Sequence, residues 1–227
     1  MRRESIAGKF ITLEGAEGAG KSSLMSAISE WLAAKGLEVL TSREPGGTPV
    51  GEVLRDLLLD PKHPITPMTE LALMFASRAQ HIEEIIKPAL AKGVWVICDR
   101  FTDSSYAYQG SGRGFNLESI SAFEALTIDN YAPDLTLLLD IPVELGLQRA
   151  AQVGEPDRFE REAMEFFQKV RAGFLARAET EQRIKVIDAS ADKAAVERHA
   201  LLLIEQLWLS SEPVSYTHLT LPTIYSV

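Results

Sequence analysis

The stretch FITLEGAEGAGKSSL, residues 10–24, places three glycines within six positions, directly after an apolar run. Glycine costs conformational entropy on folding, so such a cluster indicates backbone conformations that other residues avoid. Residues 15–22 match the pattern G-x-x-x-x-G-K-S, with a predicted strand before them and a predicted helix after them. A phosphate-binding loop requires this context. The pattern therefore predicts an α/β domain that binds a nucleoside triphosphate.

The residue types of this loop predict its chemistry. Glycines let successive backbone N–H groups face one concave surface, and the following helix adds the positive end of its dipole. Lys21 can reach the β- and γ-phosphates, and the Ser22 hydroxyl can ligate Mg²⁺. We predict that ATP binds to the loop residues Gly15, Ala16, Glu17, Gly18, Ala19, Gly20, Lys21, Ser22 and Ser23.

Apolar runs rich in Val, Ile and Leu alternate with longer helical patterns along the chain. The candidate strands are KFITLE, LEVLTS, VWVICD, DLTLLLDI and IKVIDA. Gly36 and Gly93 stand where helices are expected to end, and Pro142 suits a first helical turn. We predict a five-stranded parallel sheet with helices on both faces and with ligands at the carboxyl ends of the strands.

Length, composition and charge narrow the class of protein. The chain has 227 residues, 46% of them hydrophobic, and residues 1–212 are expected to form one domain. Its net charge of −9 argues against nonspecific binding of nucleic acid. No apolar run approaches the roughly 20 residues of a membrane span, and no targeting segment follows Arg2 and Arg3, so we expect a cytoplasmic protein without membrane partners. Cys98 is the only cysteine, which excludes an internal disulfide and a cysteine-based zinc cluster.

The last fifteen residues do not fit the alternating pattern. Residues 213–227 contain no Lys, Arg, Asp or Glu and follow a predicted helix that is already complete. We interpret them as a non-native or disordered tail. The alternative interpretation is a native β-rich extension.

Three further clusters point to a second ligand. REPGGT, residues 43–48, follows the second predicted strand, and Phe75 and Arg78 lie at i, i+3 on one helix. DRFTDSSYAYQGSGRG, residues 99–114, follows the third strand. Taken one at a time, REPGGT could be only a tight turn, Phe75 a core residue, and Asp99–Arg100 a salt bridge. Together, an aromatic face, hydroxyl and amide groups and several arginines describe a pocket for a base joined to a phosphate.

These motifs, with LLLDIPVELGLQRA, resemble the bacterial thymidylate kinase family over residues 9–208. The resemblance implies the P-loop nucleoside monophosphate kinase fold, a mobile lid at about residues 149–162, ATP and dTMP as substrates, Mg²⁺ as cofactor and a homodimer. The segment RAAQVGEPDRFERE is similar to the enterobacterial type, in which the catalytic arginines lie in the lid. Arg149, Arg158 and Arg161 are the candidates, and the sequence does not decide which of them contacts the transferred phosphoryl group.

The same resemblance implies roles around the acceptor. Glu17 resembles the acid that meets the sugar 3′-hydroxyl, and Tyr108 resembles the tyrosine packed beneath the sugar. Arg100 resembles the arginine that grips the dTMP phosphate. Asp99 resembles the acid next to the metal, which Ser22 would also ligate. With Lys21, these assignments give a catalytic set of Lys21, Asp99, Arg100, Arg149, Arg158 and Arg161.

The base end of the pocket also follows from the resemblance. Arg78 and Ser105 resemble the residues that bond the thymine edge, with help from Gln109. Glu44–Pro45 resembles a cis peptide at the pocket floor. The family's stacking phenylalanine usually lies four residues before this arginine, where this chain has Met74. We predict that Phe75, one position later, stacks on the base, with Met74 as the alternative. The predicted dTMP site is then Glu17, Pro45, Phe75, Arg78, Arg100, Ser105, Tyr108 and Gln109.

Two other functions remain open from the sequence. The first is a kinase for another nucleoside monophosphate, and the second is a module that binds ATP without transferring phosphate. The GTPase pattern N-K-x-D is absent from the chain, which disfavours that branch. The cluster of acceptor residues disfavours the non-catalytic module, because a sensor needs no second nucleotide pocket.

Overall fold

The protein is described by a computed structural model of residues 8–152, 158–159 and 162–211. Five strands form one parallel sheet in the order β2-β3-β1-β4-β5. They are β1 (Phe10–Glu14), β2 (Val39–Arg43), β3 (Trp95–Asp99), β4 (Leu135–Asp140) and β5 (Ile184–Asp188). All five predicted strands are confirmed. The order reverses at β1, so the crevice at its carboxyl end is where such sheets bind ligands.

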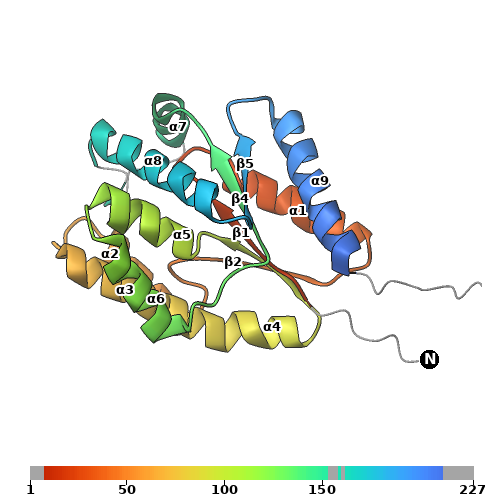
Figure 1. Cartoon of the computed structure of the whole chain (residues 1–227), viewed down its shortest axis with the longest axis horizontal. Coiled ribbons are helices and arrows are strands. Elements are labelled where there is room, and N and C mark those ends of the chain that lie inside the picture. Colours follow the sequence, from red (N-terminus) through yellow and green to blue (C-terminus); the bar gives the residue numbers. More distant parts are fainter. Residues whose placement is uncertain (1–7, 153–157, 160–161, 212–227) are drawn as a thin grey trace, which may run out of the picture.

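Helices connect the strands (Figure 1). They are α1 (Lys21–Ala34), α2 (Pro49–Leu59), α3 (Pro67–His81), α4 (Lys87–Ala91), α5 (Thr102–Ser105), α6 (Leu117–Ile128), α7 (Val143–Ala150), α8 (Met164–Thr180) and α9 (Lys193–Ser211). Two π-helical segments, η1 (Ile82–Ile86) and η2 (Tyr106–Gly112), continue α3 and α5. In the described residues no helix is both long enough and apolar enough to cross a membrane.

Helix ends follow local sequence signals. Gly36 and Gly93 have φ values of 79° and 81° just beyond α1 and α4, which confirms the predicted ends. Pro142 is the N-cap of α7 and so lies just before the predicted first turn. The sequence interpretation missed α2, although Thr48 caps it by accepting a hydrogen bond from the Gly51 N–H at 2.9 Å.

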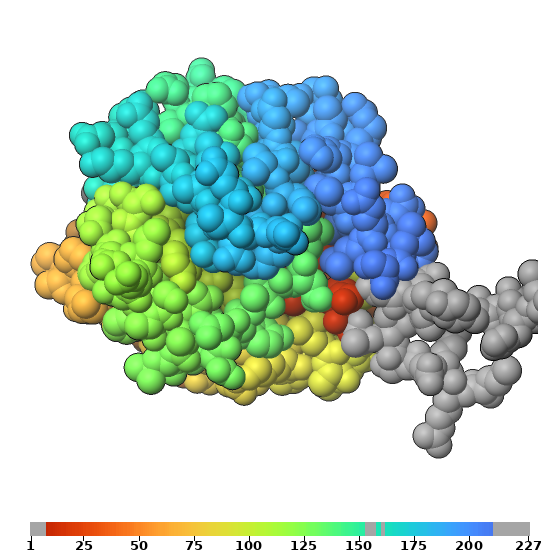
Figure 2. Space-filling model, viewed as in Figure 1, coloured from red at the N-terminus to blue at the C-terminus, as the bar shows by residue number. Residues whose placement is uncertain are grey.

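The sheet is covered on both faces because successive side chains of a strand point in opposite directions. Ile11 and Leu13 pack against α1 and α9, which lie together beside the sheet in Figure 1. Phe10 points the other way, into a cluster shared with α3 and α6. Leu138 meets α8 in a third cluster. Figure 2 shows one face of the molecule, most of which is covered by the C-terminal third of the chain, in blue, and by residues 100–130, in green. Little of the red N-terminal part is visible from this side.

Candidate active site

The phosphate loop lies between β1 and α1 and packs tightly on its neighbours. Gly15, Gly18 and Gly20 have φ values of 135°, 71° and 90°, which L side chains rarely adopt. A Cβ on Gly15 would lie 2.4 Å from the Leu139 carbonyl oxygen. A Cβ on Gly18 would lie 2.1 Å from the Gly146 oxygen. The glycine pattern in the sequence is therefore required by the backbone of the loop.

Lys21 is the first residue of α1 and is buried, with 6% of its surface exposed. Its Nζ donates to the carbonyl oxygens of Gly15 at 3.2 Å and Ala16 at 3.1 Å. Burial, followed by the positive charge of Arg100, lowers the pKa of Lys21. The loop carbonyls thus hold a desolvated cation at the positive end of a helix, where an anionic ligand would be stabilised.

A cavity of about 220 Å³ lies next to this loop. It brings together residues from β1–α1, β2–α2, α3, β3–α5 and η2. The predicted site residues that line it are Glu17, Pro45, Arg78, Asp99, Arg100, Ser105, Tyr108 and Gln109. The Glu44–Pro45 peptide bond is cis, as predicted. The cavity therefore collects the predicted acceptor residues, with one exception described below.

One end of the cavity is built around Glu17 and Arg100. Arg100 Nη2 forms a short ion pair with Glu17 Oε1, and Arg100 Nη1 donates to the Gly15 oxygen at 3.0 Å. The guanidinium lies 5.0 Å from the ring centre of Tyr108, whose hydroxyl donates to Glu17 at 3.4 Å. Burial favours the neutral carboxyl, but Arg100 and Lys21 outweigh it and lower the pKa of Glu17 to about 2. Glu17 is therefore ionised at neutral pH and accepts hydrogen bonds only.

Another part of the cavity lining is built around Arg78, of which 2% is exposed. Its Nη1 donates to Ser105 Oγ at 3.1 Å, and its Nη2 donates to the Phe101 oxygen at 3.0 Å. The guanidinium lies between the rings of Phe75 and Phe101, at 4.9 and 5.3 Å from their centres. This packing fixes the plane of the guanidinium relative to the cavity.

The prediction that Phe75 stacks on a base is wrong. Phe75 is fully buried in the core cluster with Phe10 and packs 6.0 Å from the Phe123 ring. Met74 lines the cavity instead. Adjacent helix residues point about 100° apart, so a shift of one position turns the side chain away from the cavity. The ring of Phe75 packs against the guanidinium of Arg78, at 4.9 Å from the ring centre.

The predicted lid arginines lie in different surroundings. Arg149 Nη1 donates to the Ala189 oxygen at 3.1 Å, and a Cβ on Gly18 would lie 3.1 Å from the Arg149 Cβ. Arg149 is therefore next to the phosphate loop. Arg158 Nη1 pairs with Glu70 of α3 at 2.7 Å, and its Nε donates to the Leu58 oxygen. Arg161 and residues 153–157 lie outside the described part of the chain, as does the tail predicted for residues 213–227.

Gln109 and Arg158 share Glu70 as a partner. Gln109 Nε2 donates to Glu70 Oε1 at 2.7 Å, and Glu70 is 1% exposed. Phe159, next to Arg158, lines the cavity and packs edge-on against Tyr108 at 5.9 Å. Of the described residues in the predicted lid segment, Phe159 therefore lines the cavity and Arg158 binds a partner of Gln109.

The residues present are chemically suited to Mg²⁺. Asp99 Oδ1 is buried and has no hydrogen-bond partner among the described residues. A buried carboxylate oxygen without a partner is costly unless a ligand satisfies it. Ser22 is exposed in the first turn of α1 and offers a hydroxyl oxygen, the hard donor type that Mg²⁺ prefers.

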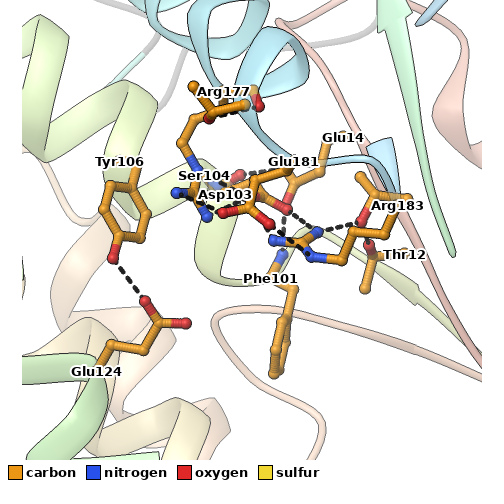
Figure 3. A network of polar contacts seen from close by, with 12 residues as sticks. Thr12, Glu14, Phe101, Asp103, Ser104, Tyr106, Glu124, Arg177, Glu181 and Arg183 are labelled. Carbon is orange, nitrogen blue, oxygen red and sulfur yellow. Dashed lines mark hydrogen bonds and ion pairs between the residues drawn. The ribbon is translucent and has the colours of Figure 1, made fainter. Parts of the chain in front are cut away.

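A buried polar network links α5 to β1 and α8 (Figure 3). Glu14 accepts hydrogen bonds from the Phe101 N–H at 2.8 Å and from Ser104 Oγ at 2.6 Å. Asp103 is fully buried and pairs with Arg177 of α8 at 3.1 Å and with Arg183 before β5 at 2.7 Å. Burial, followed by repulsion from Asp103, raises the pKa of Glu14 to about 7.

The sequence interpretation gave no role to four residues of the cavity, namely Arg55, Leu59, Ser104 and Phe159. Arg55 belongs to α2, where it donates from Nη1 to the Pro45 oxygen at 2.9 Å. The capping signal Thr48–Pro49 would have predicted this helix and hence the face of the helix on which Arg55 lies. Glu14 and Ser104 carry no motif of their own, because their role depends on contacts across 90 residues of sequence.

Known proteins with similar sequences were compared with this chain. A protein-family model for thymidylate kinase matches residues 13–200. The thymidylate kinase of Methylobacillus flagellatus is 50% identical over 200 residues, which cover 88% of this chain and 98% of that protein. That of Chromohalobacter salexigens is 53% identical over 194 residues, covering 84% and 92%. That of Pseudomonas fluorescens is 52% identical over 204 residues, covering 89% and 97%. This chain belongs to the thymidylate kinase family.

Proposed function

We propose that this protein transfers the γ-phosphoryl group of ATP to the phosphate of dTMP. The observation that carries the proposal is the placement of buried Lys21 and its phosphate loop beside a cavity whose lining combines two kinds of residue. Arg100 and Arg55 supply positive charge. Arg78, Ser105 and Met74 supply hydrogen-bond donors and an apolar wall.

These two groups of lining residues suit the phosphate and the base of a nucleoside monophosphate. The acceptor phosphate would lie against Arg100, because guanidinium groups bind phosphate oxygens with paired hydrogen bonds. Arg78 donates only, so its partner on the base would be a carbonyl oxygen, which thymine provides. Tyr108, 6% exposed, would form a rigid wall beneath the sugar, and ionised Glu17 would accept from the 3′-hydroxyl.

The reaction needs positioning more than acid–base catalysis. The second pKa of a phosphate monoester is near ~6, so the attacking oxygen of dTMP is already ionised at neutral pH. That oxygen forms a bond to the γ-phosphorus as the bond to the β–γ bridging oxygen breaks and ADP leaves. Lys21 and Arg100 would offset the repulsion between two anions and the charge on the moving phosphoryl group. Exclusion of water by Phe159 and the lid would prevent hydrolysis of ATP.

Ser22 and Asp99 would hold Mg²⁺. The ion would neutralise part of the negative charge on the phosphates of ATP. Asp99 Oδ1, which has no hydrogen-bond partner among the residues that the structure describes, supports the assignment.

An assay of ADP production tests the proposed reaction. The purified protein is supplied with ATP and, in turn, dTMP, dUMP, dCMP, AMP or GMP, and dTMP is expected to give the highest kcat/KM. Lys21→Ala should fold normally but lose at least a hundredfold in kcat, because removal of one charge-stabilising group typically costs 10²–10³ in rate. A preference for another monophosphate, or tight ATP binding without ADP production, would overturn the proposal in favour of the two alternatives above.

We also propose that two copies of the chain associate through α2. Val50, Val53 and Leu57 are 52%, 68% and 39% exposed, and their spacing places them on one face of the helix. Such a face is stabilised when a second copy covers it. Light scattering should give the mass of a dimer, and Val53→Lys should shift the population toward the monomer. A wild-type protein that is monomeric at micromolar concentration would contradict this proposal.

A further inference from the structure

A chain of four hydrogen-bonded side chains runs from β2 to the base end of the cavity. Ser42 Oγ lies 2.7 Å from Nε2 of His81, whose Nδ1 lies 3.0 Å from Oε1 of Glu44. Glu44 Oε2 accepts from Nε of Arg78 at 2.7 Å. His81, Glu44 and Arg78 are 0%, 4% and 2% exposed. The proposed phosphoryl transfer gives no role to Ser42 or His81.

The chemistry of the carboxylate sets the direction of these hydrogen bonds. An ionised Glu44 accepts and does not donate, so Nδ1 of His81 carries the hydrogen. The other ring nitrogen, Nε2, is hydrogen-bonded to the Ser42 hydroxyl. Each oxygen of Glu44 has one of the two partners, which fixes the carboxylate plane and, with it, the direction of the Arg78 guanidinium.

The turn after β2 leaves the imidazole little room to rotate. A Cβ on Gly47 would lie 2.6 Å from Ser42 Oγ and 2.8 Å from Nε2 of His81. Gly47 has a φ of 79°, and the Gly46 N–H donates to Ser77 Oγ at 3.1 Å. Gly47 therefore packs directly against the Ser42–His81 pair.

A metal site is the competing explanation, since ligand atoms of Glu44, His81 and Cys98 lie within 4.8 Å of one another. The charged guanidinium of Arg78 is bonded to the same carboxylate and would repel a cation. Glu44 and His81 also have their oxygen and nitrogen atoms already paired. The contacts favour a hydrogen-bonded relay.

We propose that His81 is a positioning residue for base recognition, acting through Glu44 on Arg78. The proposal deepens the proposed function and rests on its assignment of Arg78 to the base. Without the Nδ1–H donor, Glu44 Oε1 is left buried without its partner among the described residues, and the carboxylate turns to relieve this cost. Arg78 then loses its fixed direction toward the base carbonyl. Lys21 and Arg100 are untouched, so binding of dTMP should weaken while turnover is largely retained.

Two substitutions of His81 separate the relay from simple packing. In His81→Asn the side-chain amide can take the place of Nδ1–H and keep the bond to Glu44. In His81→Gln the amide reaches the Nε2 position and keeps the contact with Ser42 instead. We expect His81→Gln to raise the KM for dTMP about tenfold, since loss of one buried hydrogen bond typically changes binding by this factor. His81→Asn should stay within about threefold of the wild type, and kcat of both variants within about threefold.

A second readout follows the base carbonyl directly. The wild type should prefer dTMP to 4-thiothymidine monophosphate, in which sulfur is a weaker acceptor than oxygen, and His81→Gln should narrow that preference. His199→Leu on α9, which removes an exposed histidine, is the matched control and should leave both values unchanged. Thermal unfolding of each variant reports any loss of stability separately.

The two possible failures are distinguishable. Wild-type protein without dTMP-dependent ADP production would defeat the proposed function itself. Active wild type with equal KM values for His81→Asn and His81→Gln would overturn the relay, as would an unchanged preference for dTMP over the thio analogue. A fall in kcat without a rise in KM would also overturn it.

Discussion

Glu17 and Arg100 form an ion pair that joins the phosphate loop to the residue directly after β3. Arg100 has a φ of 71°, an unusual conformation for a residue with a side chain, and its Nη1 also donates to Gly15 of the same loop. The loop assigned to ATP and the cation assigned to the acceptor phosphate are therefore held together. The negative charge of Glu17 offsets the repulsion between the positive charges of Lys21 and Arg100.

Replacing Glu17 by Gln should weaken recognition of the sugar. The low pKa of Glu17 keeps it ionised, and hydrogen bonds to charged groups are worth about 1.5–3 kcal/mol. We expect kcat/KM for dTMP to fall at least tenfold. The preference for dTMP over its 3′-deoxy analogue should shrink in parallel, and steady-state assays of both substrates measure this. If the preference stays as in the wild type, Glu17 does not contact the 3′-hydroxyl.

Met74 and Phe75 should differ in what their substitution affects. Met74→Ala removes part of the cavity wall and should raise the KM for dTMP with little change in stability. Phe75→Ala empties a site in the core and should lower the free energy of unfolding by about 3 kcal/mol or more. Urea unfolding and steady-state kinetics of the two variants make the comparison. A stable Phe75→Ala variant with weakened dTMP binding would contradict the packing described above.

Arg149 and Arg158 should act on different substrates. Arg149 lies by the phosphate loop, so Arg149→Ala should lower kcat or raise the KM for ATP at least tenfold. Arg158→Ala removes a partner of buried Glu70 and should raise the KM for dTMP about fivefold, or about 1 kcal/mol. Arg198→Ala, an exposed arginine on α9, serves as the control. The assignment is wrong if Arg158→Ala affects only the KM for ATP.

Glu14 should make stability depend on pH. Its pKa is raised from 4.5 to about 7, so the folded protein holds this proton more tightly than the unfolded chain. The free energy of unfolding should therefore decrease as pH rises from about 5 to about 7, where the unfolded state releases the proton first. Glu14→Gln should flatten this part of the curve, whatever its effect on stability overall. Urea unfolding of both proteins at pH 5, 6, 7 and 8 tests the slope, and parallel curves would refute the role of Glu14.

The sequence determined the parts of this protein that depend on local backbone requirements. Gly15 and Gly18 are demanded by positive φ values and close backbone neighbours, so the phosphate loop could be predicted from eight consecutive residues. The five strands could be predicted because buried parallel strands are continuous apolar runs. The resemblance to the thymidylate kinase family assigned Arg78, Arg100 and Tyr108 to one pocket, and all three line the cavity.

Only the tertiary structure decided which side chain of a helix faces the cavity and which distant residue supports it. Met74 and Phe75 are both apolar, and the helical pattern allows either to point inward, but packing of α3 against α6 buries Phe75. His81 meets Glu44 across 37 residues, and Arg158 meets Glu70 of another helix. The physical reason is that helix rotation and long-range pairing are set by the sum of all packing contacts, which no local spacing records.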